Sequence, residues 1–198
     1  MDTQALTGGF AEAPVQAARA FRAALEAMAR PGRIETMTGA TPPAPLSPAA
    51  GTLLLTLADA ETPVCLAPSH DRPALRDWLT FHTGAPLVGP GEAVFAVGDW
   101  AALQPLDAYR IGVPEYPDRS ATLIVEMEEL AETGARLTGP GIKDVAALGL
   151  PEIAAFQRNA LLFPLGLDFY FTAGDRLAAL PRTTNVSPGT GARQRGDA

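Results

Sequence analysis

A Gly-Pro-Gly turn beside the only lysine of the chain is the stretch best suited to bind a ligand. Thr138 precedes Gly139, Pro140 and Gly141, and Lys143 follows two residues later. Glycine reaches backbone angles closed to other residues and proline fixes its own φ, so the turn is rigid. Successive backbone N–H groups in such a turn can point outward and hold an anion. The same pattern also describes a tight turn that only links two elements, and the sequence leaves both interpretations open.

A second segment offers further donors to an anion. Within Leu180–Thr184, Arg182 carries a planar fork of N–H donors that suits phosphate or carboxylate oxygens, and Thr183 adds a hydroxyl. If the two segments meet, they form a cradle for a phosphate or phosphonate, made of Thr138, Gly139, Gly141, Lys143, Arg182 and Thr183. The alternative is that Arg182 pairs with a surface carboxylate and binds no ligand.

The other side chains with reactive groups match no catalytic or metal-binding motif. Cys65 is the only cysteine, so it forms no intrachain disulfide, and we expect it in the core. His82 lies at the end of an expected helix, where a histidine complements the helix dipole, and a catalytic role is the alternative. His70 lies in a polar loop and receives no role. We interpret the acidic residues Glu126, Glu128, Glu129 and Glu132 as a solvated surface.

Composition indicates one globular domain. The chain has 198 residues, of which 47% are hydrophobic and 19% charged, which is enough apolar material for a sizeable core. The 15 basic and 22 acidic residues give a net charge of -7, which argues against binding to nucleic acid or a membrane surface. The N-terminus lacks a signal-peptide pattern, and no apolar run can span a bilayer. We therefore expect a cytoplasmic protein with one domain over residues 1–186 and a disordered tail at 187–198.

Hydrophobic periodicity predicts helices and strands in a mixed order. We expect helices at 14–29, 48–58, 72–81 and 151–162, with a short helix at 99–103. Strands are expected at 33–37, 62–67, 93–97, 120–127, 167–172 and 177–180, loops at 41–45 and 113–119, and frayed chain at 1–9. A glycine–aspartate pair at 174–175 predicts a hairpin between the last two strands. The predicted fold class is α/β, with a mixed central β-sheet flanked by helices.

The first helix has an apolar stripe that predicts which face it buries. Ala18, Phe21, Leu25 and Met28 recur at spacings of three and four residues, so they line one face. Charged residues lie away from that stripe, and the spacing of Glu26 and Arg30 suits an ion pair on the solvated side.

Several blocks, in order, resemble the PhnH family of the bacterial carbon–phosphorus lyase system. They are GGF (8–10), FRAALEAMARPG (21–32), LLLTLADAETPV (53–64), FHTGA (81–85), YPDRSATLIV (116–125), LTGPGI (137–142) and RNALLFPLGLDFYFTAGDRLAALPRTT (158–184). The resemblance covers residues 8–184, apart from the loop at 98–113. It implies a role in the catabolism of organic phosphonates.

The resemblance also implies a reaction and partners. With PhnG and PhnI, the family supports transfer of a phosphonate to the ribose C1 of ATP with release of adenine, which gives ribose 1-phosphonate 5-triphosphate. PhnJ then performs the radical iron–sulfur cleavage of the carbon–phosphorus bond. The family forms homodimers and resembles a reduced PLP-dependent transferase fold. We expect no PLP, because Lys143 is the only possible Schiff-base lysine and has no evident pyridinium partner.

Two functions follow as hypotheses of different classes. The first is a subunit without catalytic residues of its own, which completes a phosphonate-handling complex and meets a phosphonate or nucleotide ligand there. The alternative is a free-standing phosphate-handling transferase that uses Thr138, Lys143 and Arg182. The absence of a nucleophile or base motif favours the first.

Overall fold

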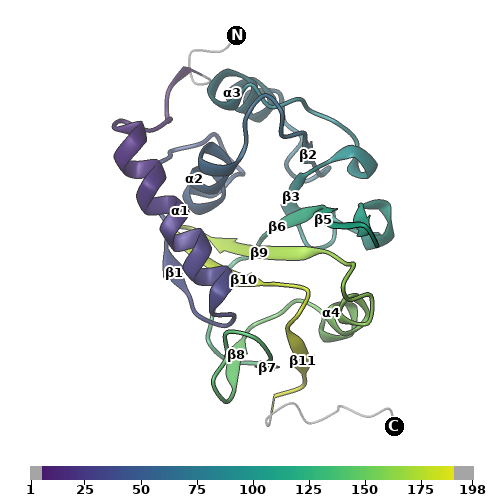
Figure 1. Cartoon of the computed structure of the whole chain (residues 1–198). Helices are drawn as coiled ribbons and strands as arrows, with labels where there is room; N and C mark the ends of the chain where they lie inside the picture. Colours follow the sequence, from purple (N-terminus) through teal and green to yellow (C-terminus); the bar gives the residue numbers. More distant parts are fainter. Residues whose placement is uncertain (1–5, 190–198) are drawn as a thin grey trace, which may run out of the picture.

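The structure is a computed structural model that describes residues 6–189, and a six-stranded sheet lies at its centre (Figure 1). The strand order is β1-β10-β9-β6-β3-β2. Four neighbours are parallel, namely β2 (Val64–Leu66), β3 (Phe95–Asp99), β6 (Thr122–Glu126) and β9 (Asp168–Ala173). Antiparallel pairing adds β10 (Arg176–Leu180) and then β1 (Glu35–Thr36). The predicted mixed central sheet and the hairpin at 174–175 are therefore confirmed.

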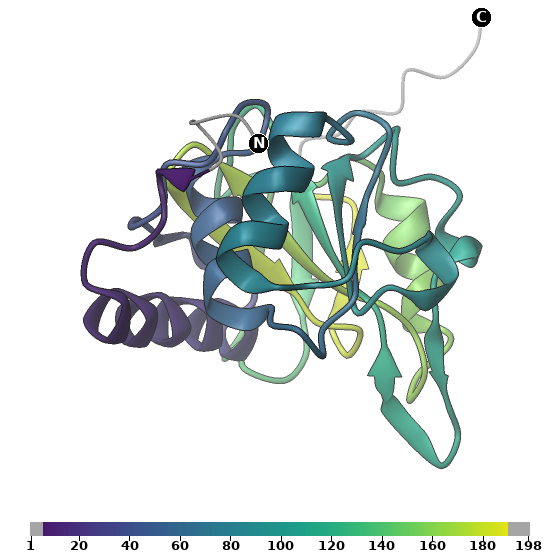
Figure 2. The same ribbon diagram turned by 90° about the horizontal axis from the view of Figure 1, so that it is seen from above.

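Helices cover the sheet on both faces, as Figure 2 shows. On one side lie α1 (Ala13–Ala29), α2 (Pro48–Leu57) and α3 (Pro73–Thr83), packed over Val97, Ile124 and Tyr170 of the sheet. On the other side α4 (Ile153–Ala160) brings Phe156 against Phe169 and Phe171. Residues that alternate along β6 and β9 thus enter two different cores, which explains why the central residues of these strands are apolar on both faces.

Two smaller sheets flank the central one. A three-stranded sheet has the order β11 (Asn185–Ser187), β7 (Ala135–Thr138) and β8 (Ala146–Leu148). A hairpin of β4 (Ile111–Val113) and β5 (Tyr116–Ser120) projects from the body (Figure 2). The prediction of a loop at 113–119 was wrong. The two prolines are tolerated because one lies at the turn and the other lies in a hairpin whose register is irregular.

Both ends of the domain extend further than expected. The Trp78 indole donates to the carbonyl of Thr7 (2.9 Å), and Thr41 N–H donates to the carbonyl of Gly8 (2.8 Å), so residues 6–9 are docked rather than frayed. Ser187, the first residue of the expected tail, instead pairs with Arg136 in the small sheet. The remainder of both expectations, at 1–5 and 190–198, lies outside the described residues. The single domain over 1–186 stays a prediction.

The start of α2 follows the local chemistry that the sequence predicts. The Ser47 side chain accepts a hydrogen bond from Ala50 N–H (3.1 Å) with Pro48 in the first turn, as expected for an N-cap. The expected helix at 99–103 is only a turn, in which the Asp99 carboxylate accepts from Ala102 N–H. Within residues 6–189, no helix is both long enough and apolar enough to cross a membrane.

The buried face of α1 is not the predicted one. Ala20, Ala24 and Ala27 are buried, whereas Phe21 and Leu25 remain 48% and 53% exposed. The alanines have the same helical spacing as the larger residues, so periodicity alone did not separate the two faces. Small side chains allow α1 to approach α2 and β10 closely, and the carbonyl of Ala24 accepts a hydrogen bond from the Tyr170 hydroxyl (3.3 Å). Phe21 and Leu25 consequently face outward, whereas Met28 of the predicted stripe is partly buried against the core.

The Gly-Pro-Gly turn packs against the C-terminal end of α1. Gly141 has φ +81°, and a Cβ placed there would lie 1.9 Å from the carbonyl oxygen of Ala29. Glycine is therefore required at this position both for its backbone angle and for the close approach of the helix.

We predict that Gly141→Ala destabilises the protein more than Gly174→Ala. Gly174 also has a positive φ (+58°), but a Cβ there meets nothing within 4 Å, so it reports the backbone cost alone, about 1–2 kcal/mol. The clash at Gly141 should add about 1–3 kcal/mol. Urea unfolding of both variants measures the difference, and equal losses would show that the close packing of the turn on α1 does not matter.

Candidate functional site

The structure brings together the two segments of the predicted cradle, but not all of their side chains. Thr138 pairs with Asn185 across β7 and β11. A Cβ at Gly139 would lie 3.0 Å from the Thr183 carbonyl oxygen, so the turn and the end of the 180–184 segment are in contact. The backbone part of the predicted site is therefore assembled. The positions of Lys143 and Arg182 determine whether cations accompany it.

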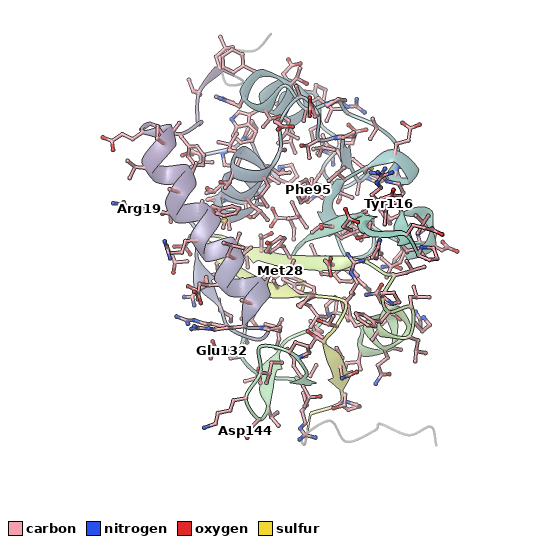
Figure 3. All side chains as sticks on the ribbon, viewed as in Figure 1. Arg19, Met28, Phe95, Tyr116, Glu132 and Asp144 are labelled. Carbon is pink, nitrogen blue, oxygen red and sulfur yellow. The ribbon has the colours of Figure 1, made fainter. Side chains whose placement is uncertain are left out.

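Lys143 lines an open depression of about 480 Å³ at the end of α1. Arg30 and Arg33 share it, together with the carboxylates of Glu132 and Asp144. Figure 3 labels Glu132 and Asp144, which lie below the end of α1. Gly141 also lines this depression, whereas Thr138, Gly139, Arg182 and Thr183 are not among its lining residues.

Arg182 lies away from Lys143 and is engaged inside the fold. Its guanidinium donates to both Asp168 carboxylate oxygens, to the Ser120 hydroxyl and to the Pro117 carbonyl (2.8 Å). The Arg182 backbone N–H also donates to Asp168 (2.8 Å). The Arg182 side chain is 11% exposed. Four of its five guanidinium N–H donors form hydrogen bonds within the protein. An anion-binding role for the six residues stays a prediction. Most of the N–H donors that Arg182 would offer to an anion already form hydrogen bonds within the protein.

Further arginines extend the cationic surface along α1. A groove of about 410 Å³ is lined by Arg19, Arg22, Arg30 and Arg33, with Glu26 and Glu35. The predicted Glu26–Arg30 ion pair is present at 3.4 Å, and Arg33 pairs with Glu35 at 2.6 Å. Among residues 6–189, Arg19 and Arg22 make no ion pair. For the charged residues of α1 the sequence predicted only a solvated face, since spacing along one helix does not show that they line a groove together with Arg33 and Glu35.

A polar cluster that the sequence did not indicate lies at the carboxyl ends of the parallel strands. His70 follows β2 and is 4% exposed, and its Nδ1 atom forms a 2.9 Å hydrogen bond with Ser69 Oγ. Its Nε2 atom has no hydrogen-bond partner and lies 4.0 Å from Glu126 Oε1 at the end of β6. Glu126 accepts from Ser47 N–H (2.7 Å) and the Thr172 hydroxyl (3.0 Å). This edge is where open α/β sheets bind ligands.

Glu126 was wrongly assigned to a solvated surface. Its side chain is 11% exposed, and burial raises the pKa of its carboxyl, against the lowering effect of its hydrogen bonds to Ser47 and Thr172. Burial lowers the pKa of His70, which Asp99 opposes and Arg72 reinforces. The strand pattern failed here because β6 is buried on both faces, so its polar position also lies inside the protein.

The remaining candidates, Cys65 and His82, both make contacts within the fold. Cys65 is buried as expected, and burial raises the pKa of its thiol, which disfavours the reactive thiolate. His82 lies in the last turn of α3, where its Nε2 atom donates to the Thr7 carbonyl (3.2 Å) and its ring packs on Trp78. It holds the N-terminal segment in place. No group of three or more His, Cys, Asp or Glu side chains suited to a metal ion occurs in the part of the chain that the structure describes.

Comparison with known proteins identifies the chain's relatives. The family model described as "Bacterial phosphonate metabolism protein (PhnH)" matches residues 8–187. A Rhizobium meliloti (strain 1021) protein, "Alpha-D-ribose 1-methylphosphonate 5-triphosphate synthase subunit PhnH", is 41% identical over 196 residues, which cover 93% of this chain and 96% of the relative. A Stutzerimonas stutzeri protein, "Putative C-P lyase subunit protein HtxG", is 30% identical over 199 residues, which cover 90% of this chain and 95% of that relative. The resemblance inferred from the sequence blocks is confirmed.

We predict that Arg182→Ala costs about 3 kcal/mol of unfolding free energy, because it leaves the Asp168 carboxylate largely unpaired. Arg158→Ala is the control. The side chains of Arg158 and Glu152, which form an ion pair, are 67% and 42% exposed, so this pair should contribute less than about 1 kcal/mol. Thermal and urea unfolding measure both. Equal, small effects would mean that Arg182 is free to serve a ligand. Any loss of ligand affinity in Arg182→Ala must be corrected for unfolding.

The buried pair predicts opposite pH dependences of stability. His70 is protonated more readily in the unfolded chain than in the folded one. The contribution of neutral His70 to the free energy of unfolding is therefore present above about pH 6.5 and is lost as the pH falls below that value. Glu126 has the opposite sign, since its raised pKa means that stability is lost as the pH rises above about 4.5. His70→Gln should remove the loss of stability on acidification. Glu126→Gln should remove the loss of stability as the pH rises. Urea unfolding from pH 4.5 to 7.5 checks this, and unchanged slopes in both variants would contradict it.

Proposed function

The chain belongs to the PhnH family of bacterial phosphonate metabolism proteins, and on this premise we propose that it is the PhnH subunit of a ribose 1-methylphosphonate 5-triphosphate synthase. The observation that carries the proposal is the 41% identity to a synthase subunit over nearly the full length of both chains. Such a synthase replaces the adenine on the ribose C1 of ATP by a phosphonate. A phosphonate oxygen forms the new bond to C1, the bond from C1 to the adenine nitrogen breaks, and that nitrogen gains a proton.

Within that complex the chain acts with other subunits, which we propose to be PhnG and PhnI, with PhnJ for the later cleavage of the carbon–phosphorus bond. A homodimer is the proposed state of the isolated chain. Use of ATP suits a cytoplasmic location. The engagement of Arg182 with Asp168, Ser120 and Pro117 supports a non-catalytic subunit over a free-standing transferase, because Arg182 was one of the three residues that the transferase required.

We propose that the fold is a reduced PLP-dependent transferase that does not hold PLP. The only lysine, Lys143, lies in an open depression beside Arg30 and Arg33, and no aromatic side chain lines it to stack on a pyridine ring. The carboxylates of Glu132 and Asp144 also line the depression, but both are exposed, so neither is held as a buried partner for a pyridinium nitrogen. The residues present at Lys143 therefore do not fit the cofactor. Incubation with PLP should give no Schiff-base absorbance that borohydride treatment removes.

We predict that adenine is released from ATP and methylphosphonate only when this chain is combined with PhnG and PhnI. The reason is that the chain supplies a binding surface and its partners supply the reacting groups. Chromatography of adenine measures the reaction for the complete mixture and for the mixture without this chain.

Two outcomes would contradict the proposal. Adenine release at the full rate without this chain would remove its role in the synthase. Release by this chain alone, lost in Lys143→Ala, would favour the free-standing transferase. Arg136→Ala is the matched control, because Arg136 is an exposed cation outside the depression that contains Lys143.

A further inference from the structure

The outer face of α1 combines large apolar side chains with arginines that form no ion pair with any residue from 6 to 189. We propose that this face is a docking surface for another subunit, one that presents an apolar patch rimmed by carboxylates. The inference rests on the proposed function, since it requires that the chain works in a complex, and it names the chemistry of the partner surface. Figure 3 shows Arg19 on this outer side of the helix.

The distribution of side chains on α1 is the first argument. The helix buries three alanines against its own core and leaves Phe21 and Leu25 about half exposed. A helix stabilised only by its own domain gains by placing its large apolar residues inside. Phe21 and Leu25 lie four residues apart, so they adjoin on one side of the helix. Exposed adjoining apolar side chains on a helix are a feature of surfaces that bind another protein.

Charge is the second argument, and it specifies the partner. A groove along α1 is lined by four arginines and two glutamates, a local excess of two positive charges in a chain with a net charge of -7. Phe21 and Leu25 do not line this groove, but Arg22, which does, lies three residues before Leu25 and so adjoins it on the helix. Both glutamates already pair with arginines of the same chain, Glu26 with Arg30 and Glu35 with Arg33. Arg19 and Arg22 remain available, and arginine is enriched where proteins bind one another.

A second copy of this chain fits the surface less well than a different subunit. In a symmetric contact the same face meets itself, so each protomer offers the other only what α1 and its groove contain. The carboxylates of that face are Glu26 and Glu35, and both are engaged within their own chain. Two faces with an excess of positive charge would repel each other. A partner with unpaired carboxylates around an apolar centre satisfies Phe21, Leu25, Arg19 and Arg22 together.

The test is assembly of full-length chains with co-expressed PhnG, PhnI and PhnJ. Phe21→Glu and Leu25→Glu place a charge where the partner is apolar, and each should weaken assembly at least about tenfold. Arg19→Glu with Arg22→Glu should slow association at low salt. It should also reverse the salt dependence of the association rate between about 0.05 and about 0.5 M, because added salt then screens a repulsion instead of an attraction. Affinity and association rate are measured by biolayer interferometry, with the immobilised complex that lacks this chain.

Phe81→Glu is the matched control, because Phe81 is 49% exposed on α3, close to the 48% of Phe21. It should assemble as the wild-type chain does. If the wild-type chain does not assemble at all, the proposed function is overturned and the docking surface with it. If the wild-type chain and Phe21→Glu assemble equally well, only the docking surface is overturned. The docking surface alone is also overturned if light scattering shows that Phe21→Glu converts a homodimer to monomers while the variant still binds the other subunits.

Discussion

The guanidinium of Arg182 holds together three parts of the fold that meet at the end of β10. Asp168 belongs to the start of β9, Ser120 and Pro117 belong to the projecting hairpin, and Arg182 itself begins the segment that leaves the central sheet. With that segment anchored, β11 reaches β7 and closes the small sheet. The Gly-Pro-Gly turn after β7 is thereby held against the end of α1, and Lys143 lies near Arg30 and Arg33. A largely buried ion pair thus determines where the surface cations lie.

The same region limits what Arg182 can offer to the anion cradle that the sequence predicts, and the anion-binding role itself stays a prediction. A guanidinium that forms a buried ion pair costs much to release, because its carboxylate partner would remain unpaired. Cations without an ion pair among residues 6–189, Arg19 and Arg22, lie instead on α1, the helix that also exposes Phe21 and Leu25. An arginine in a buried ion pair stabilises the fold, whereas an arginine without an ion pair can bind a partner. The two kinds differ in their contacts and not in residue type.

The polar cluster at the edge of the parallel strands is the other place where burial changes the meaning of a residue. His70 and Glu126 are 56 positions apart, and both are nearly enclosed. Burial favours the neutral form of each, so the two pKa values move in opposite directions. The His70 Nε2 atom without a hydrogen-bond partner is unusual for a buried polar group. The hydrogen bonds of Glu126 to Ser47 and Thr172 tie this edge to α2 and β9.

Local patterns in the sequence determined the family, the α/β class, the cap of α2 and most elements of the central sheet. Ser47 with Pro48 marked the start of α2, and Gly174 marked the hairpin, because caps and turns depend on adjacent residues. Only the tertiary structure decided which face of α1 is buried, since the alanines and the larger residues share one period. It also decided that Arg182 and Lys143 diverge and that Glu126 is enclosed. These outcomes depend on contacts between residues far apart in the chain, which no local period or spacing encodes.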